Sequence, residues 1–219
     1  GAPALLGASL IRPHIIKSYA PPYLSMDSQI KLVKTLDTEC TAKERAVIIL
    51  AFDLGLRDSD IVRLTMDNLD FKRKRLSLAQ KKTGVSLTLP LPQDTAKAIK
   101  DYVKNERPRK YVKGEPLFLS LFPPHQPIKT VYAIVKKVLS KAGLKAEIKP
   151  SVSGTHLLRY SFVHALLKTG TPRAVITQRL GHKSDTSGRP YLSMDDAMLK
   201  KCALDLSLIG LGPLTVRED

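Results

Sequence analysis

The segment from Ala42 to Leu54 most constrains the fold, because it is apolar on nearly every side of a helix. A helix without a polar face is stable only when other elements cover it all round. The segment therefore predicts a multi-helix domain with this helix near its centre. Gly55, which follows directly, suits a helix C-terminal cap.

Helical periodicity surrounds this segment. Ser25 is a suitable N-cap for a helix that presents Ile30, Val33 and Leu36 at helical spacing. A further helix is expected to begin near Asp58. Other helical patterns cover residues 95–105, 129–142 and 156–168, a short helix that starts at Thr171-Pro172 and ends at Leu180-Gly181, and a last helix from about Ser193.

The pattern changes to alternating polar and apolar residues between Leu69 and Leu91, which predicts three short strands separated by basic turns. We expect an α+β fold that is mainly α, with a small three-stranded antiparallel sheet. No break in composition divides residues 20–205, so residues 21–202 are expected to form one domain. Residues 1–20 are interpreted as a lead-in whose first residues are typical of an expression scar, which predicts a missing N-terminal portion, and residues 203–219 as a tail.

The charge predicts a polyanionic partner. The chain has 36 Lys and Arg against 20 Asp and Glu, a net charge of +16. An anionic membrane is the alternative, but no long apolar span or basic amphipathic terminal helix supports it. Nucleic acid is therefore favoured. Cys40 and Cys202 match no metal-ligand spacing and form no disulfide framework, which fits a reducing, intracellular setting.

Cations and histidines gather at the ends of the expected elements. No histidine pair has zinc-ligand spacing, and no phosphate-binding glycine loop is present, so neither a metal nor a nucleotide cofactor is predicted. Each remaining group alone has a structural explanation. Arg57 could pair with Asp60, and Lys82 could be a solvated turn residue. His156 could lie on the surface, and His182 could donate to the last carbonyls of a helix.

Taken in order, these residues resemble one family. The stretches are GLRDSD at 55–60, KTG at 82–84, HLLRYSF at 156–162 and LGH at 180–182, and Tyr191 lies nine residues after His182. This series is similar to the motifs of the tyrosine recombinase (phage integrase) family, over residues from about 20 to 205. The resemblance implies that family's catalytic-domain fold.

The resemblance also implies a reaction. In the family a tyrosine attacks a DNA phosphodiester, expels a 5′ hydroxyl and forms a 3′-phosphotyrosyl link, without metal or ATP. Tyr191 would be the nucleophile, and Lys82 the general acid for the leaving oxygen. The remaining roles it implies are a phosphate clamp by Arg57 and Arg159, proton transfer at the tyrosine by His156, a hydrogen bond to a non-bridging oxygen by His182, and support of Arg57 by Asp60.

Other basic residues are expected to contact backbone phosphates without reading bases. They are Lys72, Arg73, Lys74, Arg75, Lys81, Arg107, Arg109 and Lys110. The expected partner is a double-stranded DNA recombination site bound by a dimer to tetramer of the chain, with no membrane, in a bacterial cytoplasm near the nucleoid. The apolar tail Leu204–Leu211 is expected to dock on a neighbouring protomer or on its own domain.

Three positions depart from the family pattern: Tyr160 replaces a histidine, Ser187-Gly188 replaces a threonine pair, and Asp60 replaces a glutamate. The hexapeptide PYLSMD occurs twice, at 22–27 and at 190–195. Only Tyr191, in the second copy, follows the motif series, so Tyr23 is interpreted as scaffold. A type IB topoisomerase-like enzyme and a non-catalytic DNA-binding protein remain as alternatives.

Overall fold

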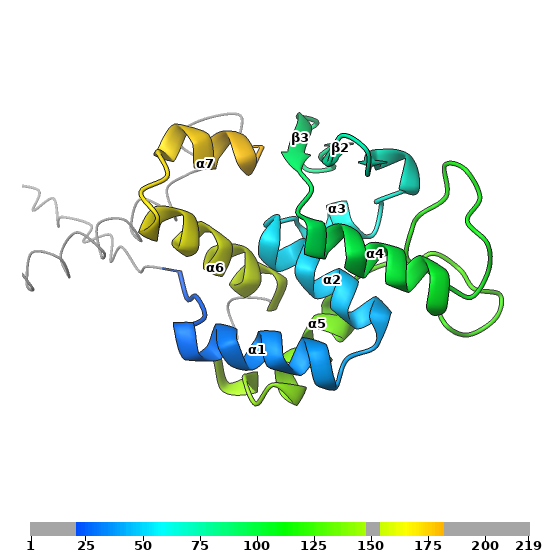
Figure 1. Ribbon diagram of the computed structural model, residues 1–219, viewed down its shortest axis with the longest axis horizontal. Coiled ribbons are helices and arrows are strands. Elements are labelled where there is room, and N and C mark those ends of the chain that lie inside the picture. Colours follow the sequence, from blue (N-terminus) through cyan, green and yellow to red (C-terminus); the bar gives the residue numbers. More distant parts are fainter. Residues whose placement is uncertain (1–20, 148–153, 182–219) are drawn as a thin grey trace, which may run out of the picture.

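A computed structural model describes residues 21–147 and 154–181, and helices dominate it (Figure 1). The helices are α1 (Met26–Thr38), α2 (Ala42–Asp53), α3 (Asp58–Ile61), α4 (Gln93–Asn105), α5 (Tyr132–Lys141), α6 (Gly154–Lys168) and α7 (Arg173–Arg179), with 3-10 turns η1 (Met66–Asn68) and η2 (Lys145–Glu147). Several expected features lie outside the described residues. They are the lead-in, His182, Ser187-Gly188, Tyr191, the helix expected from Ser193, Cys202 and the tail.

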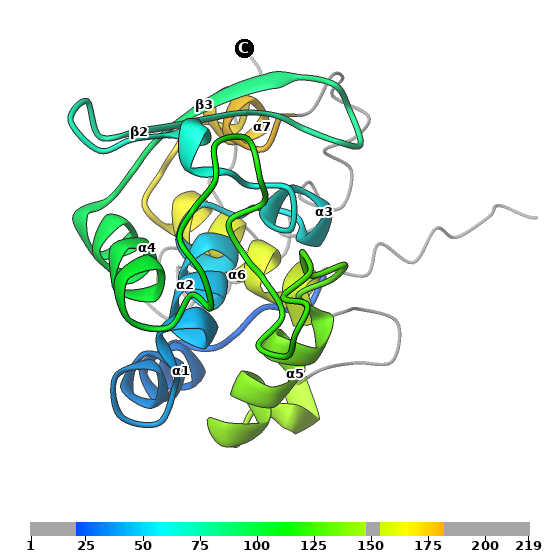
Figure 2. The same ribbon diagram turned by 90° about the vertical axis from the view of Figure 1, so that its right-hand side faces the viewer.

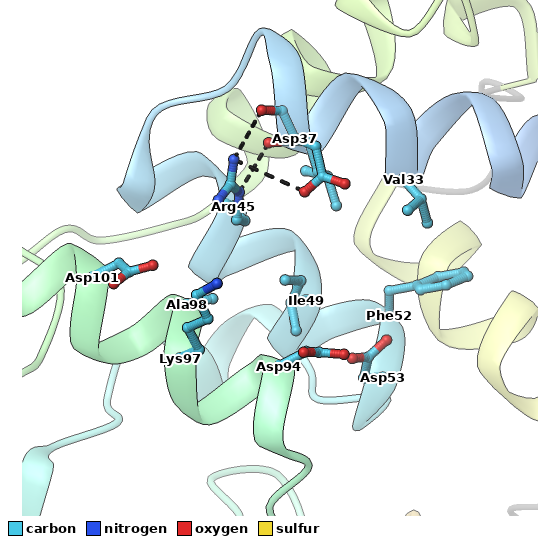
Figure 3. A pocket seen from close by; sticks show the side chains of 11 residues that line it. Val33, Asp37, Arg45, Ile49, Phe52, Asp53, Asp94, Lys97, Ala98 and Asp101 are labelled. Carbon is cyan, nitrogen blue, oxygen red and sulfur yellow. Dashed lines mark hydrogen bonds and ion pairs between the residues drawn. The ribbon is translucent and has the colours of Figure 1, made fainter.

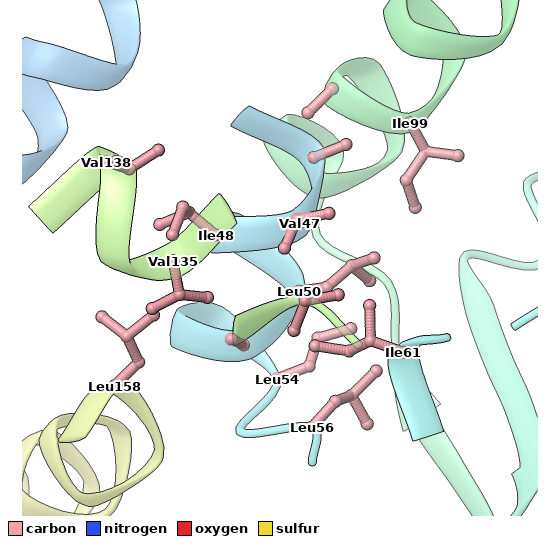
Figure 4. Packing of buried hydrophobic residues seen from close by; sticks show 14 of the residues in the cluster. Val47, Ile48, Leu50, Leu54, Leu56, Ile61, Ile99, Val135, Val138 and Leu158 are labelled. Carbon is pink, nitrogen blue, oxygen red and sulfur yellow. The ribbon is translucent and has the colours of Figure 1, made fainter. Parts of the chain in front are cut away.

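Helix α2 is the centre of the core, as its sequence predicts. It packs against α1, α4, α5 and α6. Ile48 and Leu50 have no exposed surface, and Figure 4 shows α2 side chains meeting Val135 and Val138 of α5, Leu158 of α6 and Ile99 of α4. Elements from most of the chain therefore share one core around this helix.

Local capping explains where α1 and α2 begin. The Ser25 side chain accepts a hydrogen bond from the Ser28 backbone N–H, which confirms the predicted N-cap. Thr41 and Glu44 form a reciprocal capping box at the start of α2. The sequence Thr171-Pro172 suggests a Thr171 N-cap followed by proline at the first helical position, but in α7 Pro172 occupies the N-cap and no side chain caps the helix.

Helix α5 begins three residues later than its periodicity predicts. The carboxylate of Asp58 accepts hydrogen bonds from the Thr130 hydroxyl at 2.6 Å and from the Val131 backbone N–H at 3.2 Å. These bonds hold the segment before Tyr132 against the start of α3, outside the helix. A partner far away in the sequence therefore sets this boundary.

The sheet has the order β1-β2-β3, with both pairs antiparallel, and it consists of β1 (Leu69–Asp70), β2 (Arg75–Ala79) and β3 (Ser86–Pro90). Leu76 pairs with Leu89 and Leu78 with Leu87. Figure 2 shows the β2–β3 ribbon lying across one end of the helices, beside α7, and β3 contacts α7. The predicted fold class, mainly α with a small three-stranded antiparallel sheet, is confirmed.

A second, smaller apolar cluster joins the last two described helices. Val163 of α6 packs with Ile176 and Leu180 at α7, and Phe162 lies against them. No helix within the described part of the chain is both long and apolar enough to span a membrane.

Candidate active site

Arg57 lies at the turn between α2 and α3. The turn depends on Gly55, whose φ of +61° favours glycine, and a Cβ there would lie 2.6 Å from the Phe162 ring. Phe162 of α6 therefore packs against this turn as closely as a residue without a side chain allows. The Arg57 Nη1 then donates to the side-chain oxygen of Gln80 at 3.0 Å.

Arg159 reaches the same region from α6. It is only 3% exposed. Its Nη1 donates to the carbonyl oxygen of Gly55, and its Nη2 donates to that of Leu180 at 3.1 Å. Since a guanidinium is planar, two bonds on different nitrogens fix its orientation. Burial also strengthens its attraction for an anion, because the local dielectric is low.

Lys82 lies at the tip of the β2–β3 hairpin and is exposed. The tip is closed by hydrogen bonds from the Gln80 N–H to the Val85 carbonyl at 3.0 Å and from the Gly84 N–H to the Gln80 carbonyl at 2.8 Å. The hairpin therefore presents a cation at its exposed turn, as the sequence predicts.

Asp60 holds this hairpin through the backbone of Lys81. Its Oδ1 accepts the backbone N–H of Lys81 at 3.0 Å, and its Oδ2 is buried without a hydrogen-bond partner. No ion pair among the described residues joins it to Arg57. The support of Arg57 by Asp60 therefore stays a prediction, and one described partner of Arg57 is the amide of Gln80.

Gln80 is the residue that motif reasoning missed. It is 2% exposed and contacts Arg57, Thr83 and Leu180. A signal for it exists in the sequence. Leu76 and Leu78 alternate along β2, and Gln80 continues the alternation one residue past its end, so an amide follows two apolar residues on the inward face.

His156 reports that the cations converge. Partial burial lowers the pKa of its imidazole, and the positive charges of Arg159, Arg57 and Lys82 lower it further. His156 nevertheless keeps an exposed surface. Four of the six predicted catalytic side chains, carried by α6, the α2–α3 turn and the hairpin, are therefore electrostatic neighbours. Tyr160, one turn along α6, lies with its ring 5.9 Å from that of His156.

Tyr23, the tyrosine interpreted as scaffold, stacks on the His164 ring with centroids 3.6 Å apart. Next to it, the Leu24 N–H donates to the hydroxyl of Ser161 at 2.8 Å. Both contacts tie the segment before α1 to α6.

Most of the predicted phosphate contacts are exposed. They are Lys72, Arg73, Lys74, Arg75, Lys81, Arg109 and Lys110. The run 72–75 lies at the opposite end of β2 from the hairpin tip, roughly 17 Å away at the usual rise of a strand. These charges therefore extend along the sheet from the hairpin that carries Lys82.

Arg107 corrects the prediction. Its side chain is fully buried and bonds to Glu115 at 2.5 Å and to the Leu117 carbonyl oxygen at 3.0 Å. Arg109 also pairs with Glu115, at 2.8 Å, but stays partly exposed. Arg107 therefore holds the segment after α4 in place and does not present its charge to DNA.

A separate depression of about 380 Å³ lies between α1, α2 and α4 (Figure 3). Four carboxylates line it, those of Asp37, Asp53, Asp94 and Asp101. This lining does not suit a polyanion. Among residues 21–147 and 154–181, no group of three or more His, Cys, Asp or Glu side chains could hold a metal ion.

Known proteins match this arrangement. The sequence model described as "Phage integrase family" matches residues 23–198. Tyrosine recombinase XerC of Caldanaerobacter subterraneus subsp. tengcongensis is 31% identical over 183 residues, which are 83% of this chain and 50% of XerC.

Solved recombinases share the fold. The crystal structure of XerA recombinase superposes with a TM-score of 0.68 at 21% identity, covering 89% of this chain and 66% of XerA. The XerH site-specific recombinase bound to palindromic difH substrate gives a TM-score of 0.66 at 22% identity, covering 84% of this chain and 53% of XerH. The chain thus spans half to two thirds of these relatives. Since the family match covers most of it, the chain belongs to the phage integrase family, the tyrosine recombinases.

Proposed function

We propose that this protein is a site-specific DNA recombinase that cuts and rejoins double-stranded DNA through a covalent tyrosine intermediate, without metal or ATP. The observation that carries the proposal is the hydrogen-bonded chain that holds Arg57 and Arg159 beside the hairpin of Lys82, whose charges also lower the pKa of His156. Such a group of cations can form an anion site, and its two arginines are held by defined hydrogen bonds. Binding alone does not require a neutral histidine beside them.

The reaction uses these groups as follows. The Tyr191 hydroxyl attacks the phosphorus, and its proton passes to the imidazole of His156, which the lowered pKa keeps neutral. The bond from phosphorus to the 5′ oxygen breaks, and Lys82 donates a proton to that oxygen. The guanidinium groups of Arg57 and Arg159, with His182, stabilise the charge on the non-bridging oxygens. A 5′ hydroxyl from another strand then reverses the steps.

The covalent link explains why no external energy source is needed. The phosphotyrosine ester that forms has a bond energy similar to that of the phosphodiester that breaks, so the exchange is close to balanced. We further propose that two to four copies assemble on DNA and that residues 203–219 contribute to assembly by docking on a neighbouring copy. Deleting residues 203–219 would abolish multimers on DNA, whereas unchanged multimers would contradict docking between protomers.

The repeated hexapeptide offers a matched test of the nucleophile. Nicked duplexes made from the DNA that flanks the gene are incubated with the protein and run on a denaturing gel. The wild type and Tyr23→Phe are expected to form a covalent adduct, since phenylalanine can still stack on His164. Tyr191→Phe is expected to form none.

An adduct that survives Tyr191→Phe would contradict the assignment of the nucleophile. Absence of any adduct with wild-type protein would favour a non-catalytic DNA-binding protein. Cleavage and resealing of a single duplex, without exchange between two duplexes, would favour the topoisomerase-like alternative.

A further inference from the structure

Gln80 lies where three parts of the site meet. It directly follows β2, which ends at Ala79, and the two hairpin lysines come next in the chain. Its side chain is almost fully buried, at 2% exposure. A buried amide is costly unless its polar atoms are hydrogen-bonded, so its contacts indicate what it does.

The amide oxygen holds two groups at once. It accepts from Arg57 Nη1 at 3.0 Å and from the Thr83 hydroxyl at 2.9 Å. Thr83 is the neighbour of Lys82 at the hairpin tip. One oxygen atom therefore fixes the guanidinium of Arg57 relative to the turn that carries Lys82.

The amide nitrogen holds the third part. Gln80 Nε2 donates to the Leu180 carbonyl oxygen at 3.0 Å, and the same oxygen accepts from Arg159 Nη2 at 3.1 Å. Arg57, Gln80, the Leu180 carbonyl and Arg159 thus form a continuous hydrogen-bonded chain. The hydrogen-bond partners determine which end of the amide is oxygen. In the flipped form the amide NH2 would face the Arg57 N–H donor, and the amide oxygen would face the Leu180 carbonyl oxygen.

Close packing keeps the amide in this place. Gly181 has a φ of +64°, and a Cβ on it would lie 2.3 Å from the Gln80 side-chain oxygen. The chain directly before His182 therefore approaches Gln80 as closely as a glycine allows. Among the standard side chains of this length, only glutamine combines an acceptor for two donors with a donor for a carbonyl.

We propose that Gln80 is a positioning residue of the phosphate site, which sets the Arg57 and Arg159 guanidinium groups relative to the Lys82 hairpin. The proposal rests on the proposed function for its catalytic consequence. If it holds, the orientation of Arg57 and Arg159 and the position of Lys82 all depend on the Gln80 amide. Substituting Gln80 leaves Arg57 in the chain but removes the hydrogen bond that orients its guanidinium, and cleavage should slow for that reason.

The first experiment needs no DNA. Side-chain ¹⁵N NMR of arginines in the full chain measures rotation about the guanidinium bonds, and the Arg57 signal is assigned with Arg57→Lys. In Gln80→Met, which keeps the length but has no hydrogen bonds to offer, the Arg57 Nη rotation is expected to become faster. Gln178→Met, the same substitution on the exposed face of α7, is the control and leaves it unchanged.

Gln80→Glu keeps the experiment decisive if Gln80→Met does not fold. Glutamate retains the acceptor for Arg57 and Thr83 but cannot donate to Leu180. The Arg57 signal is expected to stay ordered, and the backbone signals of residues 180–181 to shift. Wild-type Arg57 dynamics in Gln80→Met, or unshifted signals at 180–181 in Gln80→Glu, would overturn the proposal.

The second experiment measures single-turnover formation of the covalent adduct on the nicked duplex. Gln80→Met is expected to react roughly 10- to 100-fold more slowly, the factor that corresponds to a hydrogen bond to a charged group. DNA affinity should stay close to that of Gln178→Met, whereas the urea midpoint should fall because the bonds to Arg57 and Leu180 are lost, so the rates are compared where both variants are folded. Equal rates in the two variants would refute the catalytic role. If the wild type forms no adduct, the proposed function is contradicted. The NMR result would still decide whether Gln80 orders Arg57.

Discussion

The contact between Gly181 and Gln80 makes the substitution Gly181→Ala unusually informative. Gly181 has a left-handed φ of +64°, which alone costs a non-glycine residue about 1 kcal/mol. The added methyl would also lie 2.3 Å from the Gln80 side-chain oxygen and 2.8 Å from its nitrogen. An unattached side chain would move aside at little cost, but this amide is held by Arg57, Thr83 and Leu180.

The magnitude follows from the bonds that must break. Moving the amide loses the bond to the Leu180 carbonyl, about 1 kcal/mol, and the charged bond to Arg57, about 2 kcal/mol. We therefore expect Gly181→Ala to lower the free energy of unfolding by about 4 kcal/mol.

Gly170→Ala is the matched control, because Gly170 has a φ of +74° and no atom within 4 Å of an added Cβ. It should cost about 1 kcal/mol, the conformational part alone. Urea denaturation followed by circular dichroism measures both variants. Equal losses in the two would refute the reasoning, since they would mean that Gln80 can move away from residue 181 freely.

Three more predictions concern titration and buried charge. Because the pKa of His156 is lowered, its neutral form persists below the ordinary imidazole pKa of about 6.5. The rate of adduct formation at subsaturating DNA should therefore begin to fall only below that pH, and this fall should be absent in His156→Gln. Arg107→Met should lower the free energy of unfolding by about 3 kcal/mol, because it breaks a buried ion pair with Glu115. Arg109→Met should mainly weaken DNA binding and reduce its salt dependence. The opposite pattern would restore Arg107 as a DNA contact. Burial, and secondarily the charge of Asp94, raise the pKa of Asp53 despite a hydrogen bond from Thr95, so the folded protein binds the Asp53 proton more tightly than the unfolded chain does. The stability that this proton contributes is present at low pH and is lost as pH rises through the raised pKa. Asp53→Asn should therefore unfold at a higher urea concentration than the wild type at neutral pH, but not in acid.

Features that depend on neighbours in the chain were predictable. The apolar faces of Ala42–Leu54 require burial on all sides, and the structure places this helix at the centre of the core. The Ser25 cap uses a backbone N–H three residues away, and the alternation from Leu69 to Leu91 produces the strands because side chains alternate between two faces. The order of the motifs also identifies the family, which the family match confirms.

The partners of buried polar groups were decided by the tertiary structure. Gln80 bonds to Arg57 and to Leu180, which are 23 and 100 positions away in the chain, and no local pattern encodes such pairs. For the same reason Asp60 supports the hairpin, and Arg107 is buried against Glu115 although its neighbour Arg109 is exposed. Periodicity and capping are local and can be read from the chain, whereas a buried donor must take whichever acceptor the packed core brings within 3 Å.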